Sequence, residues 1–243
     1  DSALALAQKL GYAERNPADD VEGKDACRKI CILASLAFGK HVYPDQVHTE
    51  GITKITLEDV EYASNYGGVV KLLGRVKKLD DGRLSVMVSP AIVERSGQLA
   101  GVEDVFNAIL VRGDAIGDVV FYGRGAGKLP TASAVVADVI DCAKHVNRRK
   151  LLFWEDKADG YIADYLEVPT RFYVRLSAQN PMETLAAIRE EFGEVQRLSR
   201  PGAPDDELAF VTGEGPEGEL RSKLDVLKKQ GAQVLGLIRL CDY

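Results

Sequence analysis

The sequence predicts an α+β protein, in which a mixed sheet covered by helices on one face is followed by a ferredoxin-like, ACT-like unit. Two observations carry this prediction. Strand-like runs gather between helix-like runs in the first 147 residues, and the order βαββαβ occupies residues 169–243. A chain of 243 residues is long enough for two modest cores. We therefore predict domains at residues 1–147 and 169–243, joined by a linker at residues 148–168.

Two helices are predicted before the first strands. Residues 22–39 place apolar side chains at steps of three and four, and Gly39 ends the pattern. Residues 56–67 form the second helix, where Thr56 can cap the amino end and acidic residues suit the first turn.

Four strand candidates follow. Asp81-Gly82 lies between two β-rich runs and indicates a hairpin. The candidates are residues 69–79, 83–93, 107–113 and 118–125. A glycine-rich turn at residues 123–127 then leads into a helix predicted at residues 131–146, whose basic end "NRRK" we expect to be solvated.

The C-terminal unit alternates in a regular order. Its elements are strand 171–178, helix 181–193, strand 194–200, strand 207–215, helix 217–231 and strand 234–242. This βαββαβ order within about 75 residues is typical of the ferredoxin-like pattern.

Composition excludes several classes of function. A net charge of -6 and a pI near 5.3 disfavour binding to nucleic acid or to an anionic membrane. The sequence has no apolar run long enough to span a bilayer and no signal-peptide pattern, so we predict a cytoplasmic protein. The four cysteines and three histidines show no metal-ligand spacing; we expect reduced, packed thiols and no metal site.

One stretch, "GYAERNPADDVEGKDACRK" at residues 11–29, crowds carboxylates around a turn. Asp25 and Lys29 are four residues apart and share one helix face, below a turn that carries Glu14, Asp19 and Asp20. One interpretation is an exposed ion pair worth roughly 0.3 to 0.5 kcal/mol. The other is a substrate clamp with a partly buried lysine that moves a proton, because the surrounding helix is apolar. Desolvation lowers a lysine pKa whereas neighbouring carboxylates raise it, so spacing alone leaves both open.

The same residues carry a family resemblance. The run "AQKLGYAERNPADDVEGKDACRK" resembles the signature of homoserine dehydrogenases, with Gly-Tyr-Ala, Asn-Pro, Asp-Val, Gly, Asp and Lys in matching places. The similarity continues through "KICILASLAFG", "EGITKIT", "NAILVRGDAIGDVVFYGRGAG" and "PTASAVVADV", so it covers residues 1–145.

This resemblance implies an NAD(P)-dependent interconversion of L-homoserine and L-aspartate 4-semialdehyde, a step toward threonine and methionine. It implies that Lys29 relays the proton of the substrate hydroxyl. The resemblance assigns substrate binding to Glu14 and Asp25, with Asp20 assisting, and to Tyr12 within the same motif.

The resemblance also implies that Gly11 and Gly127 approach the cofactor. By itself the turn "GRGAG" at residues 123–127 is a weak signal, because such a link either cradles phosphate or only permits a tight turn. No βαβ unit surrounds it, so it is not a Rossmann fingerprint.

The sequence departs from the family at its start. Homoserine dehydrogenases carry a Rossmann domain before the signature, whereas this sequence opens inside the preceding helix. We therefore expect this chain alone neither to bind NAD(P) tightly nor to turn over.

The C-terminal unit resembles an ACT domain, a module that binds an amino acid at a paired interface through an Asp-x-Pro-Gly loop. Here the loop has Asn180 and Pro181 but no glycine. The unit therefore either binds threonine or serves only to pair sheets in a homodimer or homotetramer. The rival to the enzyme is a non-catalytic amino-acid-binding or oligomerisation module derived from it.

Overall fold

The computed structural model describes residues 5, 8–9, 17–148, 153–156 and 159–241. The chain folds into two compact units. The larger comprises Asp19–Arg95 with Trp154–Tyr243, and the smaller comprises Asp1–Ala18 with Ser96–Phe153. Each unit is described below by itself.

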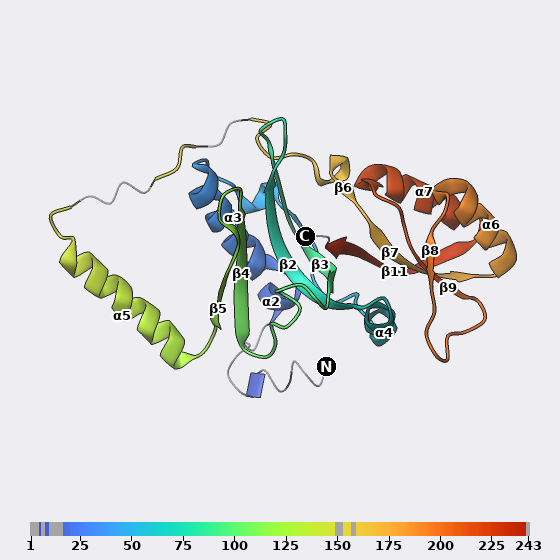
Figure 1. The fold of residues 1–243 in the computed structure, drawn as a ribbon, viewed down its shortest axis with the longest axis horizontal. Helices are drawn as coiled ribbons and strands as arrows, with labels where there is room; N and C mark the ends of the chain where they lie inside the picture. The colour runs from blue at the N-terminus through green and yellow to red at the C-terminus, as the bar shows by residue number, and fades with distance from the viewer. Residues whose placement is uncertain (1–4, 6–7, 10–16, 149–152, 157–158, 242–243) are drawn as a thin grey trace. The chain divides into compact units, whose positions relative to one another are not determined.

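A seven-stranded mixed sheet runs through the larger unit (Figure 1). Its strands are β1 (His48–Thr49), β2 (Gly68–Lys78), β3 (Leu84–Glu94), β7 (Phe172–Ala178), β8 (Gln196–Leu198), β9 (Glu207–Val211) and β11 (Ala232–Cys241). The order is β1-β3-β11-β7-β9-β8, and β2 pairs with the other edge of β3. Both β1 and β11 run parallel to β3, whereas the remaining pairs are antiparallel. The hairpin predicted at Asp81-Gly82 is confirmed.

Helices and short elements connect these strands. They are α2 (Ala18–Val21), α3 (Lys24–Phe38), η1 (Pro44–Gln46), α4 (Leu57–Asn65), η2 (Tyr165–Glu167), α6 (Pro181–Phe192), α7 (Glu217–Lys229) and the small pair β6 (Pro169–Thr170) with β10 (Gly215–Pro216). Two predicted ends are confirmed. Gly39 closes α3 with a φ of 73°, and Thr56 caps α4 by accepting a hydrogen bond from the backbone N–H of Asp59.

Both faces of the large sheet are covered by helices. On one face α3 packs its buried side against β3, and α4 packs Tyr62 and Ala63 against the same face further along. On the opposite face α6 and α7 cover alternate residues of β7, from Phe172 to Ala178. The sequence predicted α3 and α4 on one face; it did not predict that β11 of the βαββαβ segment would pair with β3.

This pairing bears on the predicted domains. Leu240 of β11 pairs with Ile92 of β3, so one sheet crosses from the predicted first domain into the predicted second. The order of elements βαββαβ is confirmed, with the strands side by side as β11-β7-β9-β8. The division at residues 147 and 168 stays a prediction.

The smaller unit holds a hairpin and a helix. Strands β4 (Phe106–Gly113) and β5 (Gly117–Arg124) pair along their whole length, and α5 (Lys128–Lys144) follows. The sequence grouped these strands with residues 69–93 in one layer. Among the described residues they instead form a sheet of their own, and α5 has no buried residue. Ordinary strand periodicity cannot distinguish these two arrangements, because it specifies faces and not partners.

A buried ion network fastens α4 to the sheet. The Arg175 guanidinium on β7 donates to Asp59 at 2.9 Å and to Glu207 at 3.1 Å. It also donates to the Thr56 hydroxyl at 2.9 Å, and the Tyr173 hydroxyl donates to Asp59. The side chains of Arg175 and Asp59 are only 7% and 1% exposed. Paired in this way, the charges are tolerated inside the protein.

A second network lies where β1, β11 and α7 meet. The Arg239 guanidinium donates two hydrogen bonds to Glu50, at 2.8 and 2.9 Å, and two to Glu217, at 2.7 and 2.6 Å. Arg221 and His48 also contact Glu50, at 3.3 and 2.6 Å. Burial by itself raises the pKa of Glu50, but hydrogen bonds from Arg239 and His48 outweigh it and hold that pKa far below its ordinary value.

We expect Asp59→Ala to lower the free energy of unfolding by about 3–5 kcal/mol, because it removes one of the two carboxylates that pair with the buried Arg175 charge and leaves only Glu207. Urea unfolding of the chain measures this change. The control is Glu61→Gln on the same helix, where the carboxylate is 56% exposed and the change should stay within about 0.5 kcal/mol. Equal losses in the two variants would contradict the prediction.

The Glu50 network should also make stability depend on pH. In the folded chain Glu50 stays charged below pH 4.5, the ordinary pKa of a glutamate, whereas in the unfolded chain Glu50 takes up a proton near that pH. The stabilisation is therefore complete above that value and is lost as the pH falls below it. In urea unfolding, the difference between the wild type and Glu50→Gln should shrink as the pH is lowered from about 5 toward about 3. A constant difference would be inconsistent with this assignment.

Candidate functional site

The predicted clamp residues that the structure describes lie around the start of α3. Asp20 lies on α2, and Asp25 and Lys29 lie on the first two turns of α3. Gly23 makes the turn between the helices with a φ of 79°, in the left-handed region that favours glycine. A Cβ at Gly23 would press on Val88 and on the Glu50 carbonyl. The turn is therefore held closely against the sheet.

Asp25 and Lys29 form an ion pair across one helical turn. The Lys29 Nζ lies 2.6 Å from the Asp25 carboxylate, and the two side chains are 62% and 43% exposed. The sequence predicted partial burial of Lys29, and in this chain that prediction is wrong. The buried side of α3 is turned toward the sheet through Cys27, Ile30 and Ala34, which leaves Lys29 on the outer side.

The outer side of α3 is not uniformly polar. Ile32 and Leu36, which follow Lys29 at helical spacing, are 53% and 40% exposed. This apolar surface explains why the sequence pattern indicated burial around Lys29. It also gives the charged pair an apolar border on a face that remains open in this chain.

Two neighbouring aspartates differ in their contacts. Asp19 accepts a hydrogen bond from Arg28 at 2.6 Å, and the Arg28 guanidinium holds the pKa of that carboxyl below its usual value. Asp20 is exposed and forms no ion pair with another described residue. The sequence could not tell these residues apart. Arg28 was missed altogether, although its place one residue before Lys29 in a carboxylate-rich stretch was a signal.

Three predicted site residues, Gly11, Tyr12 and Glu14, lie outside the described residues. Gly127 is described, in the smaller unit. It directly precedes α5 and has a φ of 113°, so a glycine is required by the backbone there. The helix begins three residues earlier than predicted. The approach of Gly127 to a cofactor stays a prediction.

The described cysteines are all free thiols; Cys27, Cys31 and Cys241 are buried as predicted, whereas Cys142 is exposed. Burial raises the pKa of the Cys31 thiol to about 12. Within the described part of the chain, no group of three acidic, cysteine or histidine side chains could hold a metal ion. None of the helices placed there has both the length and the apolar character needed to cross a bilayer.

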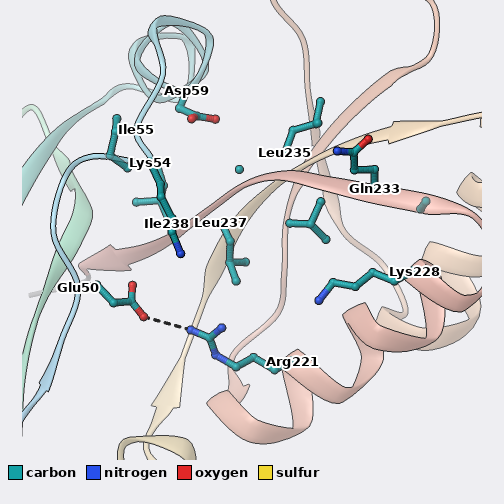
Figure 2. A pocket seen from close by; sticks show the side chains of 13 residues that line it. Glu50, Lys54, Ile55, Asp59, Arg221, Lys228, Gln233, Leu235, Leu237 and Ile238 are labelled. Atoms are coloured by element: carbon teal, nitrogen blue, oxygen red, sulfur yellow. Dashed lines mark hydrogen bonds and ion pairs between the residues drawn. The ribbon is translucent and has the colours of Figure 1, made fainter. Parts of the chain in front are cut away.

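A cavity of about 690 Å³ lies elsewhere in the larger unit, between residues 50–59 and the strand β11 (Figure 2). Glu50 and Asp59 both line it, and each belongs to one of the two ion networks. None of the described clamp residues lines this cavity. The exposed pair on α3 is therefore the candidate site that the signature and the structure share.

The larger unit defines an α+β protein that carries an exposed carboxylate–lysine pair beside a tight glycine turn. The family model for homoserine dehydrogenase matches residues 1–140. The homoserine dehydrogenase of Corynebacterium glutamicum is 38% identical over 93% of this chain and 53% of its own length, and that of Synechocystis is 36% identical over 94% and 57%.

Solved structures agree with these relatives. The structure of a homoserine dehydrogenase from Thiobacillus denitrificans superposes on the whole chain with a TM-score of 0.84 and 33% identity, and the chain covers 58% of it. That of the Staphylococcus aureus homoserine dehydrogenase gives 0.77 and 32%, with 59% covered. The chain belongs to the homoserine dehydrogenase family. It spans about half the length of the curated relatives it matches.

We expect Lys29→Met to leave the free energy of unfolding within about 0.5 kcal/mol of the wild type, because an exposed pair across one helical turn contributes little. Thermal or urea unfolding of the chain checks this expectation. A loss above about 2 kcal/mol would mean that Lys29 is a structural residue.

Proposed function

We propose that the complete protein is a homoserine dehydrogenase that interconverts L-homoserine and L-aspartate 4-semialdehyde with NAD(P), and that side chains within residues 12–29 bind the substrate and handle its proton. The observation that carries this proposal is the exposed Asp25–Lys29 pair, which lies within the stretch matched by the family model. A lysine held for structural reasons alone would be expected to make more contacts with the fold.

The exposed carboxylates suit the ammonium group of homoserine. Asp20 and Asp25 lie on either side of the Gly23 turn, and the Asp19 carboxylate beside them is occupied by Arg28. An ammonium group can bind to carboxylates through charge-assisted hydrogen bonds. We assign Asp20 and Asp25 this role, together with Glu14 and Tyr12, which the family resemblance places in the same site.

We assign to Lys29 the binding of the substrate hydroxyl and the transfer of its proton. In the direction of homoserine oxidation the C–O bond becomes a carbonyl: the carbon loses a hydride and the oxygen loses a proton, which Lys29 relays. The contact between Lys29 and Asp25 is weak because both groups are solvated, so a bound substrate can separate them at little cost. Asp25 would then bind the ammonium group and Lys29 the hydroxyl.

The nicotinamide cofactor, when bound, supplies the hydride acceptor. Of the residues predicted to face it, Gly127 suits a close approach of the cofactor, because its backbone conformation excludes a side chain and it opens α5. Gly11 is assigned to the same surface on the family resemblance. The cofactor preference between NAD and NADP is left unassigned.

We also assign the βαββαβ segment to an ACT-like unit that assembles the enzyme as a homodimer or homotetramer, supported by its strand order β11-β7-β9-β8. Threonine binding is the weaker alternative. Asn180 uses its side-chain oxygen to cap α6, and Met182 follows it where the ACT pattern has its glycine turn. A thermal shift with threonine at millimolar concentration distinguishes these roles, because a ligand that binds the folded state raises its stability.

The test of catalysis is Lys29→Met in the complete enzyme. We expect kcat for homoserine oxidation to fall by at least about 100-fold, since proton transfer by a positioned side chain typically contributes that much. The measurement is NAD(P)-dependent absorbance at 340 nm. The matched control is Lys24→Met, an exposed lysine on the same helix that pairs with Glu22 and should leave kcat within about twofold.

Three outcomes are informative. Loss in Lys29→Met alone supports the proposal, and equal activity of both variants contradicts the role of Lys29. A complete wild-type protein that oxidises no homoserine would favour the non-catalytic module instead. Turnover by the isolated chain would contradict the expectation that it is inactive alone.

A further inference from the structure

We propose that Glu50, held by Arg239, is a positioning residue for the substrate loop, defined as residues 19–23, so that the βαββαβ segment sets the geometry of the clamp. This inference rests on the proposed function of Asp20 and Asp25. It concerns residues outside the signature motif, and every contact that it uses lies within the larger unit.

The substrate loop packs directly on the residues that follow β1. The N–H of Ile52 donates to the Val21 carbonyl at 2.8 Å. A Cβ at Gly51 would collide with the Val21 carbonyl and with the backbone of Glu22. The two segments of the chain are therefore in direct backbone contact. From the other side, Gly23 lies against the Glu50 carbonyl. The loop therefore follows any displacement of residues 50–52.

Residues 50–52 are themselves held from two directions. The Glu50 N–H donates to the Val88 carbonyl on β3 at 2.8 Å, which fixes the backbone to the sheet. The Glu50 carboxylate binds Arg239 on β11 through two hydrogen bonds. Beyond Glu50 the chain leaves the strand β1 and passes the cavity of Figure 2 before α4 begins at Leu57. The Arg239 contact is thus the side-chain anchor at the point where the chain turns toward the substrate loop.

Arg239 connects this anchor to α7. Arg239 is 1% exposed, and its guanidinium also binds Glu217, the first residue of α7, through two hydrogen bonds. Arg221, one turn further along α7, donates to both carboxylates. A planar guanidinium can serve two carboxylates in this way, whereas a lysine ammonium cannot reproduce the paired geometry. A shift of α7 or of β11 is consequently transmitted to Glu50.

Three contacts therefore link α7 to the substrate loop: α7 contacts Arg239, Arg239 contacts Glu50, and residues 51–52 contact the loop. We call this series of contacts the route. The loop leads through Gly23 into α3, whose first turns carry Asp25 and Lys29. None of the three contacts touches substrate. They affect the reaction by fixing the positions of the Asp20 and Asp25 carboxylates.

The alternative is that the network only stabilises the fold. The test therefore compares Glu50→Gln, which cuts the route at its middle, with Asp59→Asn, which weakens the other buried network without contacting the substrate loop. Glu50 is 32% exposed at the edge of the cavity, so its neutral variant is compatible with folding. Arg239→Lys is a third variant that keeps the charge but loses the paired geometry.

Hydrogen exchange on the chain itself gives the first readout. In Glu50→Gln and in Arg239→Lys we expect exchange at the amide of Ile52 and at those of the substrate loop to accelerate at least about tenfold more than exchange in the remaining core. In Asp59→Asn the acceleration at those amides should stay within about twofold of that in the remaining core. Uniform acceleration throughout the unit, or no change at Ile52, would overturn the proposal.

Kinetics of the complete enzyme give the second readout. We expect Glu50→Gln to raise KM for homoserine by at least about fivefold with kcat within about twofold, whereas Asp59→Asn leaves KM unchanged. If the wild type is active and Glu50→Gln has a normal KM, the positioning role is wrong and the proposed function stands. If the wild type is inactive, the proposed function fails, and the exchange experiment still decides whether Glu50 holds the loop.

Discussion

The larger unit depends on one buried arginine. Arg239 lies where β11 pairs with β3, and its guanidinium donates four hydrogen bonds, two to Glu50 and two to Glu217. Without it, the carboxylates of Glu50 and Glu217, from distant parts of the sequence, would lose the buried guanidinium that pairs with both. With it, the parallel pairing of β11 and β3 can continue through a polar junction, because each buried charge has a partner.

The same junction relates the two halves of the sequence. Residues 21–23 belong to the signature and Arg239 lies more than 200 positions later, yet in the fold they are connected through Glu50 and the two residues after it. A second arginine, Arg175, repeats the arrangement at α4. The βαββαβ segment is therefore joined to the signature-bearing half by a continuous sheet and by two ion networks, which is why we treat it as a means of setting the site.

The candidate site contrasts with these networks. Its charges are exposed, so they contribute little to folding and can exchange partners with a charged substrate. By contrast, the buried carboxylates of Glu217 and Asp59 are bound by arginines inside the protein. Among the carboxylates near α3, Asp20 and Asp25 are the ones that we propose to receive the ligand. The buried networks of Arg239 and Arg175 thus support the fold, whereas the exposed Asp25–Lys29 pair stays accessible.

Local rules in the sequence determined most of the elements. Helical spacing predicted α3, the capping pattern at Thr56 predicted α4, and the Asp81-Gly82 turn predicted the β2–β3 hairpin, because each depends on residues close in the chain. The signature predicted the family by residue identity. The exposure of Lys29 was not predictable, since an apolar border of Ile32 and Leu36 looks the same in sequence whether or not another surface covers it.

Tertiary structure alone decided which strands pair and which charges meet. The β11–β3 pairing and the Arg239–Glu50 contact join residues far apart in the chain, where spacing carries no information about partners. Periodicity also could not show that the local β4–β5 hairpin forms a sheet of its own. The sequence by itself thus determined the family, the local elements and the residues of the signature. The arrangement that holds those residues was decided by the fold, because only the packing of β11 and α7 brings the buried Arg239 guanidinium to Glu50, 189 positions away in the sequence.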